Sequence, residues 1–493
     1  MEVREWSEYQ IPIFDTYRNE NCNIAIEAAP GSGKTTVLKQ LCKLTPPSLK
    51  SIFLAFNKSI VEDLKIALPD SMKVQTLHGL GMGAIVRHYG KTQLSEGKTF
   101  MVLKKLEPKW KADLIEVKNK NRYFFTLSKV YDLFRLYVLT DVGKEIIEIG
   151  DRHGIYVDPI MVKHLQVLVN TMVKINRGGK GIFKIDYIDM IYLPVAMNLT
   201  IPKYDRVFLD EAQDLNKCQH QLVFRLLGRS SRLISVGDPN QCIYSFIGAD
   251  AESFQALSKR PNTVTLPLSV TYRCSTEIVK KINSVFDVVE AAPNAVRGIV
   301  RDGKFDEVEE GDMVLCRNNK PLIKGYFELI LKEQKCFIKG AEFGKGLITL
   351  ISPYKNLTCE HCLDLLYEKL ERLESDLHKR GVSHPKYNAG YIKLSDNIFL
   401  FKAIGENYNR VSETLGLIDN IFQDDGEGTM LSTIHKAKGL EADRVFLLQP
   451  ELIPSKFAVE DWEIEQEQKL LFVAYSRPKK ELIFIKNYLD ENE

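Results

Sequence analysis

A glycine-rich turn with a lysine and a threonine lies near the start of the chain, where residues 28–35 read AAPGSGKT. An apolar stretch at 24–28 predicts a strand before the turn, and a helical pattern follows it. Glycines in such a turn let backbone N–H groups curl around phosphate oxygens, and the helix N-terminus adds positive potential. Lys34 has the charge to bridge β- and γ-phosphates, and Thr35 has a hydroxyl for Mg²⁺. The pattern predicts a nucleoside triphosphate site made of Ala29, Pro30, Gly31, Ser32, Gly33, Lys34, Thr35 and Thr36.

Two adjacent carboxylates, Asp210 and Glu211, follow the apolar residues RVFL of another predicted strand. Ligands of parallel α/β sheets bind at the carboxyl ends of the strands, which is where these acids would lie. One carboxylate can hold magnesium and its neighbour can polarise an attacking water. We therefore expect Thr35 and Asp210 to hold Mg²⁺ and Glu211 to act on water. A solvated acidic turn is the alternative, and the strand and the upstream glycine-rich turn both weigh against it.

The chain around these residues alternates short apolar strands with helical stretches, which is typical of parallel α/β sheets. Two charged, helical-looking stretches interrupt this pattern. The sequence predicts one α/β domain at 1–85 plus 186–266 with an insert at 86–185, and a second at 267–320 plus 426–493 with an insert at 321–425. Strands are expected at 24–28, 51–56, 73–78, 206–210, 232–238, 312–317, 429–435, 444–449 and 481–486.

Composition limits the classes of protein that fit. The chain has 493 residues of which 44% are hydrophobic, which excludes disorder as the dominant state. Its 67 Lys and Arg residues and 65 Asp and Glu residues give a formal net charge of +2, so a polyanion would have to bind in a local groove. No run of about 18 apolar residues predicts a membrane span. The first residues lack the apolar core of a secretory signal, and nine scattered cysteines suit a reducing compartment. We expect an intracellular protein of cytoplasm or nucleoid, neither secreted nor bound to a membrane.

Further motifs follow the glycine-rich turn in a fixed order along the chain. They are DEAQD at 210–214, VGDPNQCIYSFIGA at 236–249, VTYRCS at 270–275, STIHKAKGLEADRVFLL at 432–448 and EQKLLFVAYSRPKK at 467–480. This series resembles that of superfamily 1A DNA helicases of the UvrD/Rep-like group. AFNKS at 55–59 and QTLHG at 75–79 resemble in particular the F-box-bearing DNA helicases. The resemblance implies two RecA-like P-loop domains in tandem, each with a mainly helical inserted subdomain, with ATP between the domains and single-stranded DNA across their top.

The resemblance also implies roles for single residues. Gln10 has the place of the glutamine that reads adenine, although a polar helix residue is the alternative. Tyr272 matches the aromatic residue that stacks on adenine, and Glu441 matches the glutamate at the nucleotide sugar. Among residues near the γ-phosphate, Gln241 matches the sensing glutamine and Arg273 matches an arginine beside it. The full catalytic set that the resemblance implies is Lys34, Asp210, Glu211, Gln241, Arg273 and the arginine finger Arg477.

A path for single-stranded DNA is implied by the same motifs. Binding without sequence choice needs aromatic platforms for bases and polar partners for phosphates. Phe246 stands where UvrD-like proteins commonly have a tryptophan, and a phenylalanine can still stack with less area. Core packing is the alternative for each aromatic residue. The candidate DNA contacts are Phe56, Asn57, Lys58, His78, Tyr244, Phe246 and His435. The first insert is basic and aromatic around residues 104–125, which fits either a DNA grip or a solvated helical face.

Together with the predicted nucleotide site, the resemblance implies an ATP- and Mg²⁺-dependent DNA helicase that moves along single-stranded DNA and unwinds duplexes at single-strand/duplex junctions. Family analogy implies 3′→5′ polarity. The alternatives are a DNA-stimulated ATPase that strips proteins from DNA with little unwinding, a nucleotide-gated DNA-binding scaffold without turnover, and the same motor on RNA. We expect a monomer in isolation. Roles in repair, replication and recombination are all compatible, and partners from replication or recombination are not specified by the residues.

Overall fold

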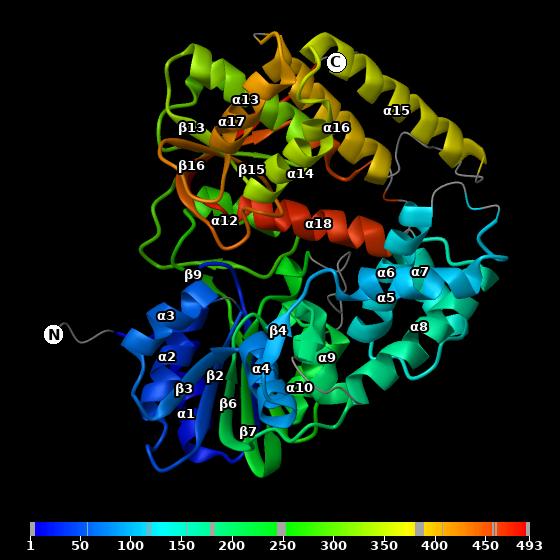
Figure 1. Cartoon of the computed structure of the whole chain (residues 1–493). Coiled ribbons are helices and arrows are strands. Elements are labelled where there is room, and N and C mark those ends of the chain that lie inside the picture. The colour runs from blue at the N-terminus through cyan, green and yellow to red at the C-terminus, as the bar shows by residue number, and fades with distance from the viewer. Residues whose placement is uncertain are drawn as a thin grey trace. The chain divides into compact units, whose positions relative to one another are not determined.

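The protein is described by a computed structural model (Figure 1). It describes residues 5–56, 58–115, 117, 120–153, 155–177, 183–243, 253–379, 389–406, 408–455, 458 and 461–489. Contacts between residues divide the chain into two compact units, Met1–Ser269 and Val270–Glu493, here called the N-terminal unit and the C-terminal unit.

The N-terminal unit is built on a six-stranded sheet with the order β3-β2-β6-β7-β1-β8, in which all pairs are parallel. Parallel strands are buried on both faces, which explains why their sequences are nearly continuous apolar runs. The strands expected at 24–28, 51–56, 206–210 and 232–238 are confirmed. The observed bounds are β1 Asn23–Ala28, β2 Ser51–Ala55, β3 Met72–Thr76, β6 Tyr204–Leu209, β7 Leu227–Gly237 and β8 Thr263–Leu268.

Helices cover both faces of this sheet (Figure 1). Alternate strand residues serve the two faces, so that Ile24 and Ile26 belong to one apolar cluster and Ala25 belongs to the other. The first face carries α1 (Gln10–Asn19), α2 (Lys34–Leu44) and α3 (Lys58–Ala67). The second face carries α4 (Leu77–Tyr89), α9 (Tyr187–Ala196), α10 (Lys217–Phe224) and α11 (Ser253–Ser258).

The strand expected at 73–78 is shorter than the sequence indicated. It ends at Thr76, and Leu77 and His78 are the first residues of α4. The Thr76 hydroxyl accepts a hydrogen bond from the N–H of Gly79 at 3.0 Å, which is a helix N-cap. This cap starts the helix where the apolar pattern alone suggested that the strand continues.

The insert of the N-terminal unit is a helical subdomain with its own core. Its helices are α5 (Lys98–Leu106), η1 (Glu107–Trp110), α6 (Lys120–Leu136), α7 (Lys144–Arg152) and α8 (Pro159–Arg177). Trp110, Phe124 and Phe134 belong to the apolar cluster inside it. The chain enters and leaves through β4 (Thr92–Leu94) and β5 (Phe183–Ile185), which pair in parallel.

A buried ionic network ties this insert to helix α9. Arg135 of α6 donates to Asp186 at 2.7 Å and to Asp189 at 2.8 Å, and Lys98 of α5 donates to Asp189 at 2.6 Å. Asp186 also caps α9 by accepting from the N–H of Asp189. Because buried charges are tolerated only when they are paired, the network fixes α5 and α6 against the start of α9.

The C-terminal unit contains a seven-stranded parallel sheet with the order β11-β17-β16-β12-β15-β13-β14, and a separate short pair formed by β9 and β10. The strands expected at 312–317, 444–449 and 481–486 are confirmed, and the strand expected at 429–435 is present but ends at Thr433. The observed bounds are β9 Val270–Thr271, β10 Glu290–Ala291, β11 Ile299–Asp302, β12 Met313–Cys316, β13 Cys336–Lys339, β14 Phe422–Gln423, β15 Thr429–Thr433, β16 Ala442–Leu448 and β17 Pro478–Ile485.

Two of these strands come from the range 321–425, which the sequence assigned to the second insert. Strand β13 pairs with both β15 and β14, with Ile338 opposite Leu431 and Phe422. This part of the range therefore belongs to the sheet, and the helical block proper runs from 341 to 421. Its core is continuous with that of the sheet, because Phe401 and Phe446 lie in one apolar cluster.

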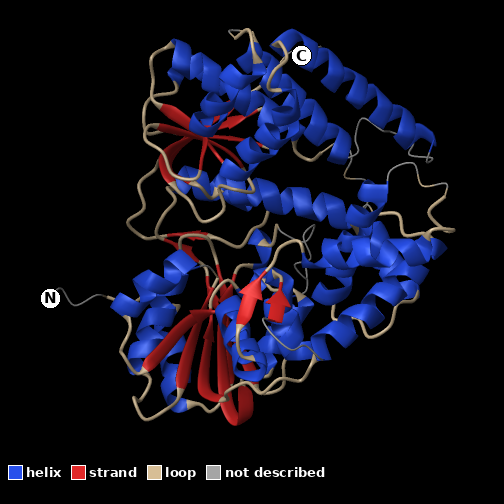
Figure 2. Cartoon of the chain, in the orientation of Figure 1, coloured by secondary structure: helices blue, strands red, loops and turns tan. Residues whose placement is uncertain are grey.

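Helices account for most of the remaining C-terminal unit (Figure 2). They are α12 (Thr276–Asn283), α13 (Asn319–Leu331), α14 (Ala341–Ile351), α15 (Cys359–Lys379), α16 (Ala389–Gly405), α17 (Val411–Ile421) and α18 (Asp461–Tyr475). Short 3₁₀ turns in the two units are η2 (Ala212–Asp214), η3 (Pro239–Gln241), η5 (Phe305–Glu307), η6 (Ser352–Tyr354) and η8 (Pro450–Leu452). Within the described ranges, no helix has the length and apolarity that a membrane crossing requires.

Candidate active site

The turn between β1 and α2 has the backbone shape of a phosphate cradle. Gly31 and Gly33 adopt positive φ values of 72° and 86°, which only glycine reaches without strain. The Ser32 hydroxyl donates to the carbonyl of Ala29 at 2.7 Å and braces the turn from inside. Helix α2 starts at Lys34 and has no side-chain cap, so the N–H groups of its first turn and its positive end suit an anion.

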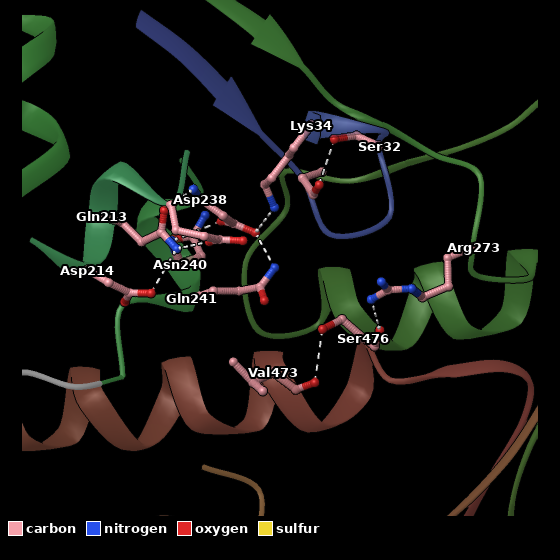
Figure 3. A network of polar contacts seen from close by, with 12 residues as sticks. Ser32, Lys34, Gln213, Asp214, Asp238, Asn240, Gln241, Arg273, Val473 and Ser476 are labelled. Atoms are coloured by element: carbon pink, nitrogen blue, oxygen red, sulfur yellow. Dashed lines mark hydrogen bonds and ion pairs between the residues drawn. The ribbon is translucent and has the colours of Figure 1, made fainter. Parts of the chain in front are cut away.

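Lys34 is held close to a buried carboxylate of the neighbouring strand end. Its Nζ lies 3.6 Å from Oδ2 of Asp238, the residue that follows β7 (Figure 3). Pro30, Thr35 and Thr36 complete the turn and the first residues of the helix. The lysine is thus positioned at the phosphate cradle by an ion pair that an anionic ligand would compete for.

Thr35 and Asp210 come together at the carboxyl end of β6. The threonine hydroxyl donates to Oδ2 of Asp210 at 3.2 Å. Burial, aided by the negative charge of Glu211, raises the pKa of Asp210 to about 7. A hydroxyl and two carboxylates are the oxygen ligands that Mg²⁺ prefers, and a cation there would offset the cost of burying the acids. The donor set therefore fits magnesium.

Glu211 has an unusual backbone conformation, and its carboxylate accepts a hydrogen bond from Gln213. Its φ is 51°, in the left-handed region that non-glycine residues seldom occupy. Gln213 of η2 donates through Nε2 to Oε2 of Glu211 at 2.5 Å and to Oδ2 of Asp214 at 3.3 Å. The carboxylate that would act on water is thereby fixed in direction.

Gln241 reaches the same region from the turn after β7. Its Nε2 donates to Oδ2 of Asp238 at 2.6 Å, the oxygen that also faces Lys34 (Figure 3). The N–H of Asp238 in turn donates to Oε1 of Gln213 at 3.0 Å. The structure therefore brings Lys34, Gln241 and the acidic segment after β6 into one polar network.

Asp238 and Gln213 were not among the residues singled out from the sequence. The signal for Asp238 was available, since it follows β7 as Asp210 follows β6, and both strand ends lie at the same sheet edge. The place of Gln213 depends on a contact between segments that are 25 residues apart, which no local pattern reveals.

Gln10 is buried at the start of α1 and lies against the phosphate cradle. Its Oε1 accepts from the N–H of Ser7 at 3.1 Å. A Cβ atom placed on Gly33 would lie 3.7 Å from its Nε2, which shows how close the amide comes to the turn. An open pocket beside it is lined by Glu8, Tyr9, Pro12, Leu266 and Pro267.

Two candidate DNA contacts of the N-terminal unit, Phe56 and His78, lie near Asp210. Phe56 follows β2 with 48% of its surface exposed, and Lys58 begins α3 on the surface. Phe56 and His78 line one small cleft together with Asp210. Burial lowers the pKa of His78 and keeps its imidazole neutral. The other three candidates, Asn57, Tyr244 and Phe246, lie outside the described residues.

In the C-terminal unit, Arg273 and Glu441 form a direct ion pair. Nε of Arg273 lies 2.6 Å from Oε2 of Glu441. Nη1 of Arg273 donates to the carbonyl of Ser476 at 3.1 Å (Figure 3). Burial acts to raise the pKa of Glu441, but a hydrogen bond from Lys479 and the charge of Arg273 outweigh it, so the pKa lies below its usual value. Tyr272, next to Arg273, has 53% of its surface exposed.

Arg477 has only 1% of its surface exposed. Its guanidinium donates to the carbonyls of Val473 at 2.9 Å and Leu440 at 3.1 Å, and to the Ser476 hydroxyl at 2.8 Å. Three groups of its own unit therefore orient it. His435 follows β15, and burial, aided by the charge of Arg317, lowers its pKa to about 3.

Comparisons with known families match both units. The model of the UvrD/REP helicase N-terminal domain matches residues 55–262, and that of the UvrD-like helicase C-terminal domain matches residues 410–488. Together the two segments cover more than half of the chain. Proteins of this family use ATP, generally with Mg²⁺, and the donor set around Thr35 and Asp210 agrees with that use.

Curated relatives carry the same resemblance. The F-box DNA helicase protein 1 of Schizosaccharomyces pombe is 25% identical over 93% of this chain and 55% of its own length. The F-box DNA helicase 1 of Gallus gallus is 24% identical over 93% and 47%, so this chain spans about half the length of both. The ATP-dependent DNA helicase Rep of Buchnera aphidicola is 21% identical over 93% of this chain and 92% of its own. Matches at both family domains, in the expected order and across nearly all of the sequence, lead to one conclusion: the chain belongs to the UvrD-like helicase family.

Proposed function

We propose that the chain hydrolyses ATP and uses the energy to move along single-stranded DNA in the 3′→5′ direction and to unwind duplex DNA at junctions. One observation carries the ATP hydrolysis in this proposal. Lys34, Thr35 and Asp210 converge at one sheet edge, with the lysine 3.6 Å from Asp238 and the threonine 3.2 Å from Asp210. Phosphoryl transfer needs a lysine for the phosphates, and a hydroxyl and acidic side chains for the metal ion and the water. All of these lie beside the glycine-rich turn.

The proposed roles follow from the chemistry of each side chain. Lys34 binds the β- and γ-phosphates, while Thr35 and Asp210 hold Mg²⁺, which neutralises charge on the phosphate oxygens when bound. Glu211 orients the attacking water, and Gln241 contacts the γ-phosphate. Catalysis is then mainly electrostatic positioning, because the transition state spreads charge over the equatorial oxygens.

The remaining nucleotide contacts are proposed for both units. Gln10 and Tyr272 hold the adenine, and Glu441 contacts the sugar. Arg273 and Arg477 supply positive charge to the γ-phosphate, which would make hydrolysis depend on the position of the C-terminal unit. That dependence would convert each hydrolysis cycle into relative movement of the units along a strand.

DNA as the track is supported by the relatives that carry DNA helicase in their names. Phe56, His78 and His435 offer ring faces for bases, as do Tyr244 and Phe246, with Asn57 and Lys58 as phosphate partners. Since the chain spans about half the length of the F-box relatives, its action on DNA by itself is the point to test.

The test is unwinding of two matched duplexes, one with a 3′ and one with a 5′ single-stranded tail, in ATP and Mg²⁺. DNA-stimulated hydrolysis is measured in parallel. Lys34→Ala is expected to lower kcat for hydrolysis at least about 10²-fold, because it removes a charge that acts in the transition state. Lys43→Ala, an exposed lysine of the same helix, is the matched control and should leave both activities unchanged.

Opening of the 3′-tailed duplex alone supports the proposal in full. Opening from the 5′ tail as well would keep the motor and overturn the polarity. Stimulated hydrolysis with no opening from either tail would favour an ATPase that strips proteins from DNA. Hydrolysis by Lys34→Ala at the unmodified rate would overturn the assignment of the nucleotide site itself.

A further inference from the structure

Gln213 lies between Glu211 and Asp214 in the segment that follows β6. Its side-chain amide makes hydrogen bonds through both its nitrogen and its oxygen. Only 1% of its surface is exposed. Its Nε2 donates to Oε2 of Glu211 at 2.5 Å and to Oδ2 of Asp214 at 3.3 Å, while its Oε1 accepts from the N–H of Asp238 at 3.0 Å (Figure 3). One amide therefore joins the segment after β6 to the segment after β7.

Asp238, at the other end of this link, also has defined side-chain contacts. The carboxylate of Asp238 accepts from Nε2 of Gln241 at 2.6 Å and faces Nζ of Lys34 at 3.6 Å. Strands β6 and β7 are neighbours in the sheet, with Leu209 opposite Ser235, so their ends are close enough for one side chain to span. The contacts run from Glu211 through Gln213 and Asp238 to Lys34 and Gln241.

Packing leaves the amide little freedom. A Cβ atom on Gly237 would lie 2.7 Å from Oε1 of Gln213 and 2.9 Å from Cδ2 of Phe254. Real Cβ atoms do not approach neighbours so closely, so the glycine at this position is what allows the amide to sit where it does. The amide is held on one side by Gly237 and on the other by the acids that it contacts.

We propose that Gln213 is a positioning residue for ATP hydrolysis: it fixes the carboxylate of Glu211 and ties it to the strand end that carries Asp238 and Gln241. The inference rests on the function proposed above, in which Glu211 orients the attacking water. The distance between the carboxylate of Glu211, which orients the water, and the side chains of Lys34 and Gln241, which contact the γ-phosphate, is then fixed. General-base action contributes about 10²–10⁴ in rate, and a misplacement of about 1 Å can cost about 10².

The test replaces the amide by an apolar side chain of similar length, Gln213→Met. Because Glu211 stays but is no longer directed, kcat for DNA-stimulated hydrolysis should fall about 10²-fold, while KM for ATP should change less than about threefold. A purely structural role would lower the amount of folded enzyme and would not produce this split. Asn176→Ala removes another buried amide of the same unit, one that accepts from Lys98, and serves as the matched control for destabilisation.

A double-mutant cycle tests whether Gln213 acts through Glu211. Glu211→Asp shortens the carboxylate out of reach of the amide but keeps an acid in the site. In that background Gln213→Met should lower kcat less than about threefold, since the contact is already lost. Gly237→Ala provides a second route, because its added methyl displaces the amide without changing it. This variant should also lower kcat with little change in KM.

The outcomes separate this inference from the proposed function. If Lys34→Ala is inactive but Gln213→Met and Gly237→Ala keep the unmodified kcat, only the positioning role is overturned. Equal losses from Gln213→Met in the Glu211 and Glu211→Asp backgrounds would also overturn it. If Lys34→Ala retains full hydrolysis, the proposed function fails first and this inference falls with it.

Discussion

His435 illustrates how the environment of one residue sets its charge. Burial, together with the positive charge of Arg317, lowers its pKa to about 3. A histidine in an unfolded chain has a pKa near 6.5. At a pH between about 3 and 6.5, unfolding of the chain is therefore accompanied by uptake of a proton at His435. The unfolded state therefore gains stability relative to the folded state as the pH falls below about 6.5, and this loss of stability is complete near pH 3.

We predict that His435→Gln flattens the pH dependence of stability. The thermal midpoint of the unmodified chain should fall more steeply between pH 7 and pH 5 than that of the variant, as followed by circular dichroism. His361→Gln is the matched control, because His361 lies exposed on α15 and is not buried on folding. Identical slopes for the unmodified chain and His435→Gln would contradict the prediction.

Single residues were predictable where chemistry and local sequence coincide. The glycine turn, Lys34 and the acids after β6 form recognisable local patterns, and the structure brings them together at one sheet edge. The partners of Asp238 were not predictable in the same way, because Gln213 and Lys34 reach it from distant segments. Their roles in catalysis stay predictions until the variants are measured.

At the scale of elements, the ionic network around Arg135 joins the first insert to helix α9, which packs on the sheet. This arginine is fully buried and contacts Asp132, Asp186 and Asp189, which carry three negative charges. If Arg135 were lost, Lys98 would still pair with Asp189. Among the described residues, no ion pair would then remain for Asp132 and Asp186. Removing one partner of a buried ion pair costs about 3–5 kcal/mol, far more than the loss of a surface pair.

We predict that Arg135→Met lowers the free energy of unfolding by about 3–5 kcal/mol. Urea denaturation measures this change. Arg372→Met is the matched control: Arg372 pairs with Glu368 at 2.9 Å on the surface of α15 and should contribute less than about 1 kcal/mol. Equal effects of the two substitutions would mean that the buried network does not hold the insert.

Strands with long apolar runs were predictable from the sequence. Very short strands, and the exact residue at which a capped helix starts, were not. Strands such as β2 and β16 stand out by their β-branched and aromatic residues. Strands β13 and β14 have four and two residues within a Lys-, Glu- and Leu-rich stretch, so their composition is masked by the helices around them. The start of α4 is decided by the Thr76 cap, which a hydrophobic pattern does not register.

For the whole molecule, the formal charge of +2 gives no general attraction to DNA, so affinity must come from local basic surfaces. The first insert offers one. Nζ of Lys104 lies 5.6 Å from the ring centre of Phe100, and Nζ of Lys129 lies 4.7 Å from that of Phe125, which is 58% exposed. Lys104 also pairs with Glu107 at 3.3 Å, which would weaken its part in DNA binding.

We predict that changing Lys104, Lys105 and Lys129 to Gln reduces the slope of log affinity for single-stranded DNA against log salt by about 2, at about 0.7 for each phosphate contact. Fluorescence anisotropy over a salt series measures the slope. The control changes the exposed Lys332, Lys369 and Lys379 of the C-terminal unit to Gln, with the same loss of charge. A slope equal to that control would identify the basic stretch as a solvated helical face.

Each insert leaves and rejoins its unit through neighbouring parallel strands. Thr92 pairs with Phe183 at the first insert, and Ile338 pairs with Phe422 at the second. Paired strands lie about 5 Å apart, so the two ends of each inserted block are held close together by the rest of the fold. A block with adjacent ends can lengthen, shrink or be exchanged over generations without changing the strand order around it. Growth at these two junctions can therefore be additive: new residues can be accommodated at exposed ends of the inserted helices, while the residues that share a core with the sheet or pair with Asp186 and Asp189 stay in place.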